Sequence, residues 1–192
     1  MFVLQIPIGN MGNFSYLIAD EKTKKAAVID PGFDHEKILL QAKKYKLKIK
    51  KILLTHAHFD HTTELSAIVQ KTKAEILIHE REPFQTNLSL TKVRDNQLIR
   101  LGGLKIKVIH TPGHTPGSAC FLVGNFLFTG DTLFVDSVGR TDLPGGSEAQ
   151  IIQSLKKLSQ LPGNTTIYPG HSYNGNYSTI GEQKKTNPFM HH

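Results

Sequence analysis

The segment His56-Ala57-His58-Phe59-Asp60-His61 constrains this chain most, because it places four potential metal ligands within six residues. It follows an apolar run at residues 51–54 that is typical of a buried strand. Side chains alternate in an extended segment, so His56, His58 and Asp60 are predicted to project to one side. His61 adds a further imidazole where the next helix is predicted to begin. Three histidines and an aspartate at such a junction indicate a metal site.

Three later residues have the same placement, just beyond a short apolar run or inside a glycine turn. They are His114, after a predicted strand at residues 104–109, Asp131, which follows residues 126–130, and His171, which follows residues 167–170. Glycine beside each of them allows a tight turn and a close approach of the backbone to a ligand. We therefore predict that one sheet brings all these strand ends to a single edge.

Apolar runs and helical patterns succeed one another along the chain without a repeat or a linker. Strands are predicted at residues 2–8, 14–18, 26–29, 51–54, 75–78, 104–109, 119–123, 126–129 and 166–168. Helices are predicted at residues 35–46, 64–73, 148–158 and 179–185. Helices fall between groups of strands, which favours an α/β or α+β class with sheets packed face to face and helices outside. We expect one domain over residues 1–190, with His191 and His192 as a tag remnant.

Composition restricts the chemistry that a metal site can use here. The 192 residues are 39% apolar, which argues against disorder. The single cysteine, Cys120, excludes an intramolecular disulfide framework and a cysteine-rich zinc module. It lies in an apolar run and is predicted to be a packed thiol. Metal ligation must therefore depend on histidine and carboxylate side chains.

The net charge of +7 arises mainly from lysine, with six lysines between residues 43 and 51. Such a run could attract nucleic acid, but a solvated helix end and strand edge is the better interpretation, so no nucleic-acid partner is expected. The chain has no continuous apolar stretch of about 20 residues and no signal-peptide pattern at its start. We expect no membrane partner and a cytoplasmic location.

The chain resembles the metallo-β-lactamase-fold hydrolase superfamily in the identity and order of its candidate ligands. These are His56-x-His58-x-Asp60-His61, His114, Asp131 and His171. The resemblance covers essentially the whole chain. Within that superfamily, three further segments resemble the short glyoxalase II-like branch: residues 130–134, 139–146 and 178–188. The resemblance implies a four-layer αβ/βα sandwich with a two-metal site at one edge.

Carried over to this sequence, the resemblance implies two sets of ligands for two divalent ions. Zinc is expected at both positions, and iron or a zinc–iron pair is the alternative. His56, His58 and His114 would hold the first ion, and Asp60, His61 and His171 the second. Asp131 would bridge both. Two carboxylates and a bridging hydroxide would leave a charge of about +1, which suits a site that stabilises an oxyanion. Asp60 would also orient the nucleophile.

The implied activity is hydrolysis of a small-molecule thioester, such as S-lactoylglutathione, to a hydroxy acid and a thiol. A different enzyme class, a persulfide dioxygenase with one iron on His56, His114 and Asp131, also resembles the chain, as does a promiscuous lactonase or esterase. The sequence gives no preference between a monomer and a homodimer. Arg140 and Tyr173 are the candidate substrate-binding residues, although Arg140 could equally tie down its glycine-rich loop.

The remaining histidines and one aspartate have simpler interpretations. His79 and His110 are predicted to form structural hydrogen bonds, and His35 to lie in the first turn of a helix. Asp30, in the segment Asp30-Pro31-Gly32, could orient a metal-binding imidazole or cap a turn.

Overall fold

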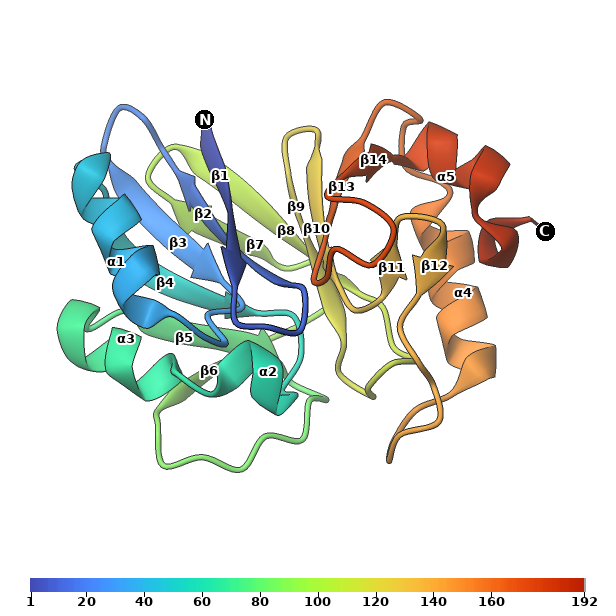
Figure 1. Cartoon of the computed structure of the whole chain (residues 1–192), viewed down its shortest axis with the longest axis horizontal. Coiled ribbons are helices and arrows are strands. Elements are labelled where there is room, and N and C mark those ends of the chain that lie inside the picture. The colour runs from blue at the N-terminus through green and yellow to red at the C-terminus, as the bar shows by residue number, and fades with distance from the viewer. Residues whose placement is uncertain (192) are drawn as a thin grey trace.

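Two large sheets face one another in the computed structural model of the chain, which describes residues 1–191 (Figure 1). The first sheet has the order β1-β2-β3-β4-β5-β6. Its strands are β1 Phe2–Ile8, β2 Asn13–Ala19, β3 Lys25–Ile29, β4 Lys48–Leu54, β5 Glu75–His79 and β6 Leu90–Val93. Strands β1 to β3 pair antiparallel and β3 to β6 pair parallel, so the carboxyl ends of β3 to β6 share one edge.

The second sheet has the order β14-β13-β10-β9-β8-β7. Its strands are β7 Leu98–Leu101, β8 Leu104–His110, β9 Ala119–Val123, β10 Phe126–Gly130, β13 Thr166–Pro169 and β14 Ser178–Thr179. Only β10 and β13 pair parallel among the described strands of this sheet. A separate hairpin is formed by β11 Leu133–Phe134 and β12 Ser137–Val138.

Helices cover the outer face of each sheet. The helices beside the first sheet are α1 His35–Lys44, α2 Phe59–Thr62 and α3 Leu65–Thr72. Those beside the second sheet are α4 Glu148–Leu158, α5 Ile180–Thr186 and the 3-10 helix η1 Pro188–Met190 (Figure 1). Ser147 caps α4 by accepting a hydrogen bond from the Gln150 amide, and Thr179 caps α5 in the same way.

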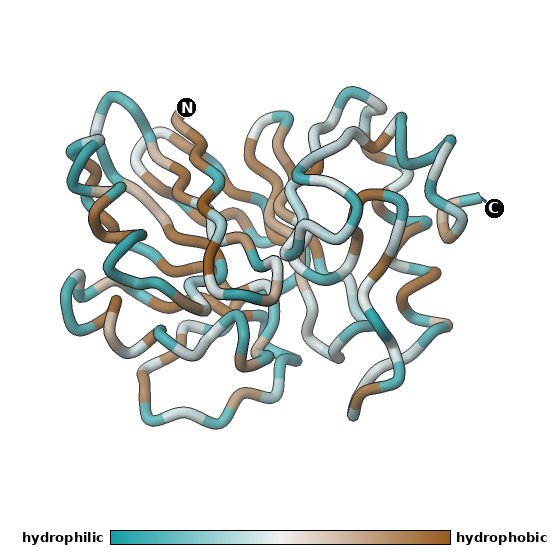
Figure 2. The backbone as a smooth tube through the Cα atoms, viewed as in Figure 1, coloured by the Kyte–Doolittle hydropathy of each residue, from teal (hydrophilic) through white to brown (hydrophobic). Residues whose placement is uncertain are grey.

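The central strands are apolar on both faces because each sheet is covered on both sides. Ile52 of β4 belongs to an outer core that includes Ile38 of α1 and Ile68 of α3. Its neighbour Leu53 points the other way, into the core between the sheets with Phe121. Figure 2 shows hydrophobic positions concentrated along these strands. The layers run helix, sheet, sheet, helix, and confirm the predicted four-layer sandwich.

Several predicted boundaries are wrong for identifiable reasons. Strand β4 begins at Lys48, earlier than predicted, because Ile49 is buried while Lys48 and Lys50 project outward. Strands β6, β7, β11, β12 and β14 were not predicted, since each has only two to four residues. Helix α2 begins at Phe59, so Asp60 does not continue an extended segment.

Two sequence predictions concern the membrane and the chain end. Within residues 1–191, no helix is long and apolar enough to cross a membrane. The predicted tag remnant is described only at His191, whose ring lies 2.9 Å from the Lys185 carbonyl oxygen. His192 lies outside the described residues.

Candidate metal centre

The seven predicted ligands meet where strands of both sheets end. His56 and His58 follow β4 of the first sheet, whereas His114, Asp131 and His171 follow β8, β10 and β13 of the second. The prediction that one sheet supplies all the strand ends is therefore wrong. Backbone hydrogen bonds join the sheets at this edge, from the Ala119 amide to the Thr55 carbonyl (2.9 Å) and from Phe14 to Gly170 (2.8 Å).

One group of donors consists of three imidazoles. His58 Nδ1 and His114 Nε2 face each other at 2.9 Å, and the His56 ring lies 4.7 and 4.8 Å from their ring centres. One nitrogen from each ring falls within 4.8 Å of the others. His56 and His114 are almost completely buried. Three converging nitrogens of this kind suit zinc or iron.

A second group combines a carboxylate with two imidazoles. Asp60 Oδ2 lies 3.3 Å from His171 Nε2 and 3.4 Å from His61 Nε2. The two Nε2 atoms are themselves 3.3 Å apart. Asp60 and His61 belong to α2, and the His61 ring also lies 4.2 Å from that of His56. The donors thus include the two sets implied by the family resemblance, together with an overlapping set of Asp30, His56 and His61.

Asp131 lies between the two groups. Its Oδ2 is 3.6 Å from His114 Nε2 and 3.3 Å from His171 Nε2, while its Oδ1 is 3.4 Å from His61 Nε2. Gly170 makes room for this carboxylate, because a Cβ at that position would lie 2.3 Å from Asp131 Oδ1. Because Oδ2 lies within 3.6 Å of a ring nitrogen from each group, this carboxylate is placed to bridge two cations.

Hydrogen bonds to oxygen acceptors orient three of the five rings, and a fourth ring lies beside a carboxylate. His114 Nδ1 donates to the Arg140 carbonyl (2.8 Å) and His171 Nδ1 to the Met11 carbonyl (3.1 Å), so Nε2 is the ring nitrogen that each presents to the cluster. His61 Nδ1 faces Asp30 Oδ2 at 3.1 Å, and His56 Nδ1 faces the Thr55 hydroxyl at 3.0 Å.

Asp30 organises this outer ring of contacts. It accepts hydrogen bonds from the Thr55 amide (2.8 Å) and hydroxyl (2.6 Å) in addition to facing His61. Its backbone has a positive φ of 48°, a conformation that aspartate tolerates better than most residues. The structure therefore places Asp30 where an imidazole-orienting residue would lie, rather than at the cap of a turn.

The two groups differ in their electrostatics. Burial lowers the pKa of His56 well below its ordinary value, and burial together with His114 lowers the pKa of His58. Burial also opposes charge on His61 and His171, but the nearby carboxylates, Asp131 and Asp60 among them, together raise both pKa values, that of His171 to about 9. His56 and His58 are thus neutral imidazoles, whereas the second group holds protons at neutral pH.

The carboxylates respond in the opposite direction. Burial would raise the pKa of Asp60 and of Asp131, but the neighbouring histidines lower both pKa values below the ordinary range. His171 and His61 donate hydrogen bonds to both Asp60 and Asp131, which stabilises the ionised form of each carboxylate. Both carboxylates are therefore ionised at neutral pH, as metal ligands must be.

The donor set fits a pair of divalent cations. Among the described residues, the buried side-chain atoms without a hydrogen-bond partner are Asn13 Oδ1, His56 Nε2, His61 Nδ1 and Asp131 Oδ1, and all four belong to the cluster or to Asn13 beside it. Buried polar groups are normally paired, so these atoms indicate a ligand at the cluster.

Two residues of the site were missed by sequence reasoning. Asn13 is buried at the start of β2, and its Nδ2 donates to Asp60 Oδ2 at 2.8 Å. Glu82, also buried, accepts from the amide of Ala57 and from the Thr115 hydroxyl. Neither lies in a recognisable motif, and their partners are 25 to 47 residues away in sequence.

The two candidate substrate residues lie at the rim. The Tyr173 ring stacks on His171 at 4.8 Å and 6°, and its edge meets Phe134. Arg140 pairs with Asp142 through two 2.7 Å hydrogen bonds, and both side chains are exposed. This pairing within the loop favours the structural interpretation of the Arg140 side chain.

The other singled-out side chains lie outside the cluster. His79 and His110 stack at 3.9 Å, and His110 Nε2 lies 2.9 Å from the Pro116 carbonyl oxygen, as a structural role predicts. His35 begins α1 and its ring contacts Glu64. Cys120 is fully buried, and burial raises the pKa of its thiol to about 11.

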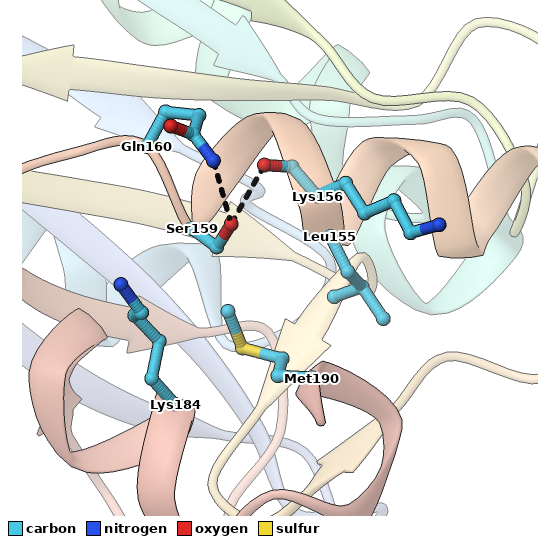
Figure 3. A pocket seen from close by; sticks show the side chains of 6 residues that line it. All are labelled: Leu155, Lys156, Ser159, Gln160, Lys184 and Met190. Atoms are coloured by element: carbon cyan, nitrogen blue, oxygen red, sulfur yellow. Dashed lines mark hydrogen bonds between the residues drawn. The ribbon is translucent and has the colours of Figure 1, made fainter. Parts of the chain in front are cut away.

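Two cavities bear on where a substrate could bind. A cavity of about 300 Å³ opens beside His58, and its lining consists of Ala57, His58, Glu82, Pro83, Thr115, Pro116 and Pro144. A cavity of about 430 Å³ lies between α4 and the C-terminal helices, lined by Leu155, Lys156, Ser159, Gln160, Lys184 and Met190 (Figure 3). None of the seven donors lines the second cavity, so only the first adjoins the candidate metal centre.

Comparison with known proteins gives the family. Residues 8–171 match the metallo-beta-lactamase superfamily. The chain therefore belongs to the metallo-β-lactamase superfamily, and its fold and donor set are those of a metal-dependent hydrolase of that superfamily.

Individual relatives are similar over nearly the whole chain. The hydroxyacylglutathione hydrolase GloC of Haemophilus influenzae is 33% identical over 96% of this chain and 96% of its own length. Among solved structures, ETHE1 from Myxococcus xanthus has a TM-score of 0.91 and 34% identity, covering 98% of this chain and 84% of that one. A di-iron-bound form of TTHA1623 has a TM-score of 0.85 and 32% identity, over 97% and 99% of the two chains.

Proposed function

We propose that this chain hydrolyses thioesters of the S-lactoylglutathione type, releasing a hydroxy acid and a thiol. The observation that carries the proposal is the arrangement of two donor groups around Asp131, which suits two cations held close together. The similarity to a hydroxyacylglutathione hydrolase over 96% of both chains supports the choice of substrate. The proposal includes a small-molecule substrate, a cytoplasmic location and a monomer or homodimer.

The proposed metal ligands are the seven clustered residues. His56, His58 and His114 would hold one ion, Asp60, His61 and His171 the other, and Asp131 both. We assign zinc to both positions, with iron or a zinc–iron pair as the alternative, because imidazole and carboxylate donors suit either metal. When bound, such ions supply a hydroxide nucleophile at neutral pH and polarise a carbonyl oxygen.

The chain's own residues would orient the reactants. Asp60 is ionised, and its Oδ2 is held by Asn13 at 2.8 Å, so its carboxylate can accept a hydrogen bond from the nucleophile. The cavity beside His58, at the lower end of ligand-pocket volumes, would accept the acyl part of the substrate. Tyr173 covers His171 and would contact the thiol part, keeping water from that side.

The proposal is tested by hydrolysis of S-lactoylglutathione with metal-loaded protein, against a control stripped by chelator. Rapid turnover that is lost with the metal supports it. The Asp131→Ala variant should lose both metal and turnover, and unchanged activity in that variant would refute the assigned site.

Metal content separates this proposal from the alternatives. About two ions per chain favours hydrolysis. One tightly held iron, with oxygen uptake on addition of a glutathione persulfide, favours a persulfide dioxygenase that uses His56, His114 and Asp131. Faster turnover of lactones or simple esters than of any thioester would point to a lactonase or esterase.

A further inference from the structure

Glu82 is a buried carboxylate that joins two loops of the candidate metal centre. It is 4% exposed and lies just beyond the end of β5. Its Oε1 accepts a hydrogen bond from the Ala57 amide at 2.9 Å. Its Oε2 accepts from the Thr115 hydroxyl at 2.6 Å and from the Gly117 amide at 3.0 Å. One side chain thus connects the loop after β4 with the loop after β8.

The donors to Glu82 are the sequence neighbours of the first group of candidate ligands. Ala57 lies between His56 and His58, and Thr115 directly follows His114. His58 and His114 are the two rings whose nitrogens face each other at 2.9 Å. The relative position of those rings therefore depends on the carboxylate that ties their backbones together.

Glu82 is itself held in place. Its amide donates to the His79 carbonyl at 3.0 Å, and Lys92 Nζ donates to its carbonyl oxygen at 3.2 Å. Its backbone packs on Gly117, where an added Cβ would lie 2.2 Å from the Glu82 nitrogen. A carboxylate fixed in this way can transmit the position of β5 to both loops.

The chemistry of the contacts requires a carboxylate. An ionised carboxylate only accepts hydrogen bonds, and here both of its oxygens face donors. A glutamine of the same size would have to turn its NH2 group toward the Ala57 amide or toward the Gly117 amide. In either orientation two N–H groups would face each other, and one buried donor would lose its partner.

We propose that Glu82 is a positioning residue that sets the geometry of the first ligand group, His56, His58 and His114, without contacting metal or substrate. The second group is held by a different residue, since Asn13 donates to Asp60. The inference rests on the proposed metal centre, and it is independent of the proposed substrate.

The test compares metal affinities of the full chain and its variants in competition with a chromophoric chelator, using zinc. Glu82→Gln should lower the affinity for one of the two equivalents by about 10- to 100-fold and leave the other unchanged, because loss of an outer contact of a ligand has this effect. Asn13→Ala should weaken the other equivalent, and the double variant should weaken both.

Two further variants serve as controls. Glu80→Gln makes the same change in an exposed glutamate that pairs with Arg94, and both of its affinities should equal those of the unmodified chain. Thr115→Val removes only one of the three donors to Glu82. It should weaken the same equivalent as Glu82→Gln, by a smaller factor, and it keeps the test decisive if Glu82→Gln fails to fold.

The possible outcomes are distinct. If Glu82→Gln and Thr115→Val only lower the melting temperature in chelator, with both zinc affinities unchanged, Glu82 is a structural residue and the proposal is overturned. If Glu82→Gln and Asn13→Ala weaken the same equivalent, the selective role is overturned. If the unmodified chain binds no zinc, the metal centre itself is wrong, which is a separate failure.

Discussion

Loading the two ligand groups with metal should release different numbers of protons. The pKa of His61 and of His171 is raised in the metal-free protein, because Asp131 and the other nearby carboxylates together outweigh the effect of burial, and that of His171 is about 9. At pH 7 both rings therefore carry a proton that a metal must displace. His56 and His58 have lowered pKa values and are already neutral.

The magnitude follows from the difference between the pKa and the working pH. Deprotonating His171 at pH 7 costs about 1.4 kcal/mol for each of two pH units, or about 2.7 kcal/mol. With His61 contributing in the same direction, the ion held by the second group should release at least about one proton from these side chains. The logarithm of its affinity should then rise by at least about one per pH unit between pH 6 and 8. The affinity for the ion held by the first group should show almost no dependence on pH from His56 and His58.

Calorimetric zinc titrations in two buffers of different ionisation enthalpy measure the protons released with each equivalent. Chelator competition at several pH values gives the slopes. Equal proton release on binding of the two zinc ions would refute the assignment of protonated imidazoles to the second group alone. A steeper pH dependence of affinity for the more tightly bound ion at low pH would refute it as well.

Three further outcomes are expected. In the presence of chelator, the raised pKa of His171 contributes about 3 kcal/mol to the stability of the protein below about pH 6.5. This contribution is lost as the pH rises through about 9. Calorimetry should therefore show a melting temperature that falls with rising pH, and bound metal should prevent the fall. Gly170→Ala places a carbon 2.3 Å from Asp131 Oδ1 and should reduce zinc affinity at least about tenfold. In Gly163→Ala the nearest contact of the added Cβ is 3.5 Å, so zinc affinity should be unchanged. Equal zinc affinities in the two variants would contradict the crowding argument. Cys120, buried and with a pKa of about 11, should react with a thiol reagent only after denaturation, so rapid modification of the native protein would contradict its burial.

The sequence determined the layered fold because the central strands are covered on both faces. A strand such as β4 must then be apolar at successive positions, and that continuous run is visible without a structure. The edge and short strands have no such signature. In β6, only Val93 is buried, and the exposed residues between it and Leu90 conceal the strand.

The sequence also identified the seven clustered side chains, because histidine and aspartate at strand ends beside glycine form a pattern of their own. Their division into two groups was implied by the family resemblance, but the residue pattern alone does not contain it, because it depends on the tertiary structure. Helix α2 begins at Phe59 and turns Asp60 away from His58, a local change that alternation along a strand does not predict. The opposite pKa shifts of His56 and His61 likewise depend on which side chains face them.

The residues that hold the ligands in place depended on the fold alone. Asn13 and Glu82 are isolated polar residues in sequence, and each gains its role from partners brought close by the packing of the two sheets. A ligand is recognisable from its own chemistry, since few side chains can bind a metal. A positioning residue is recognisable only from its contacts, and those exist only after the chain has folded.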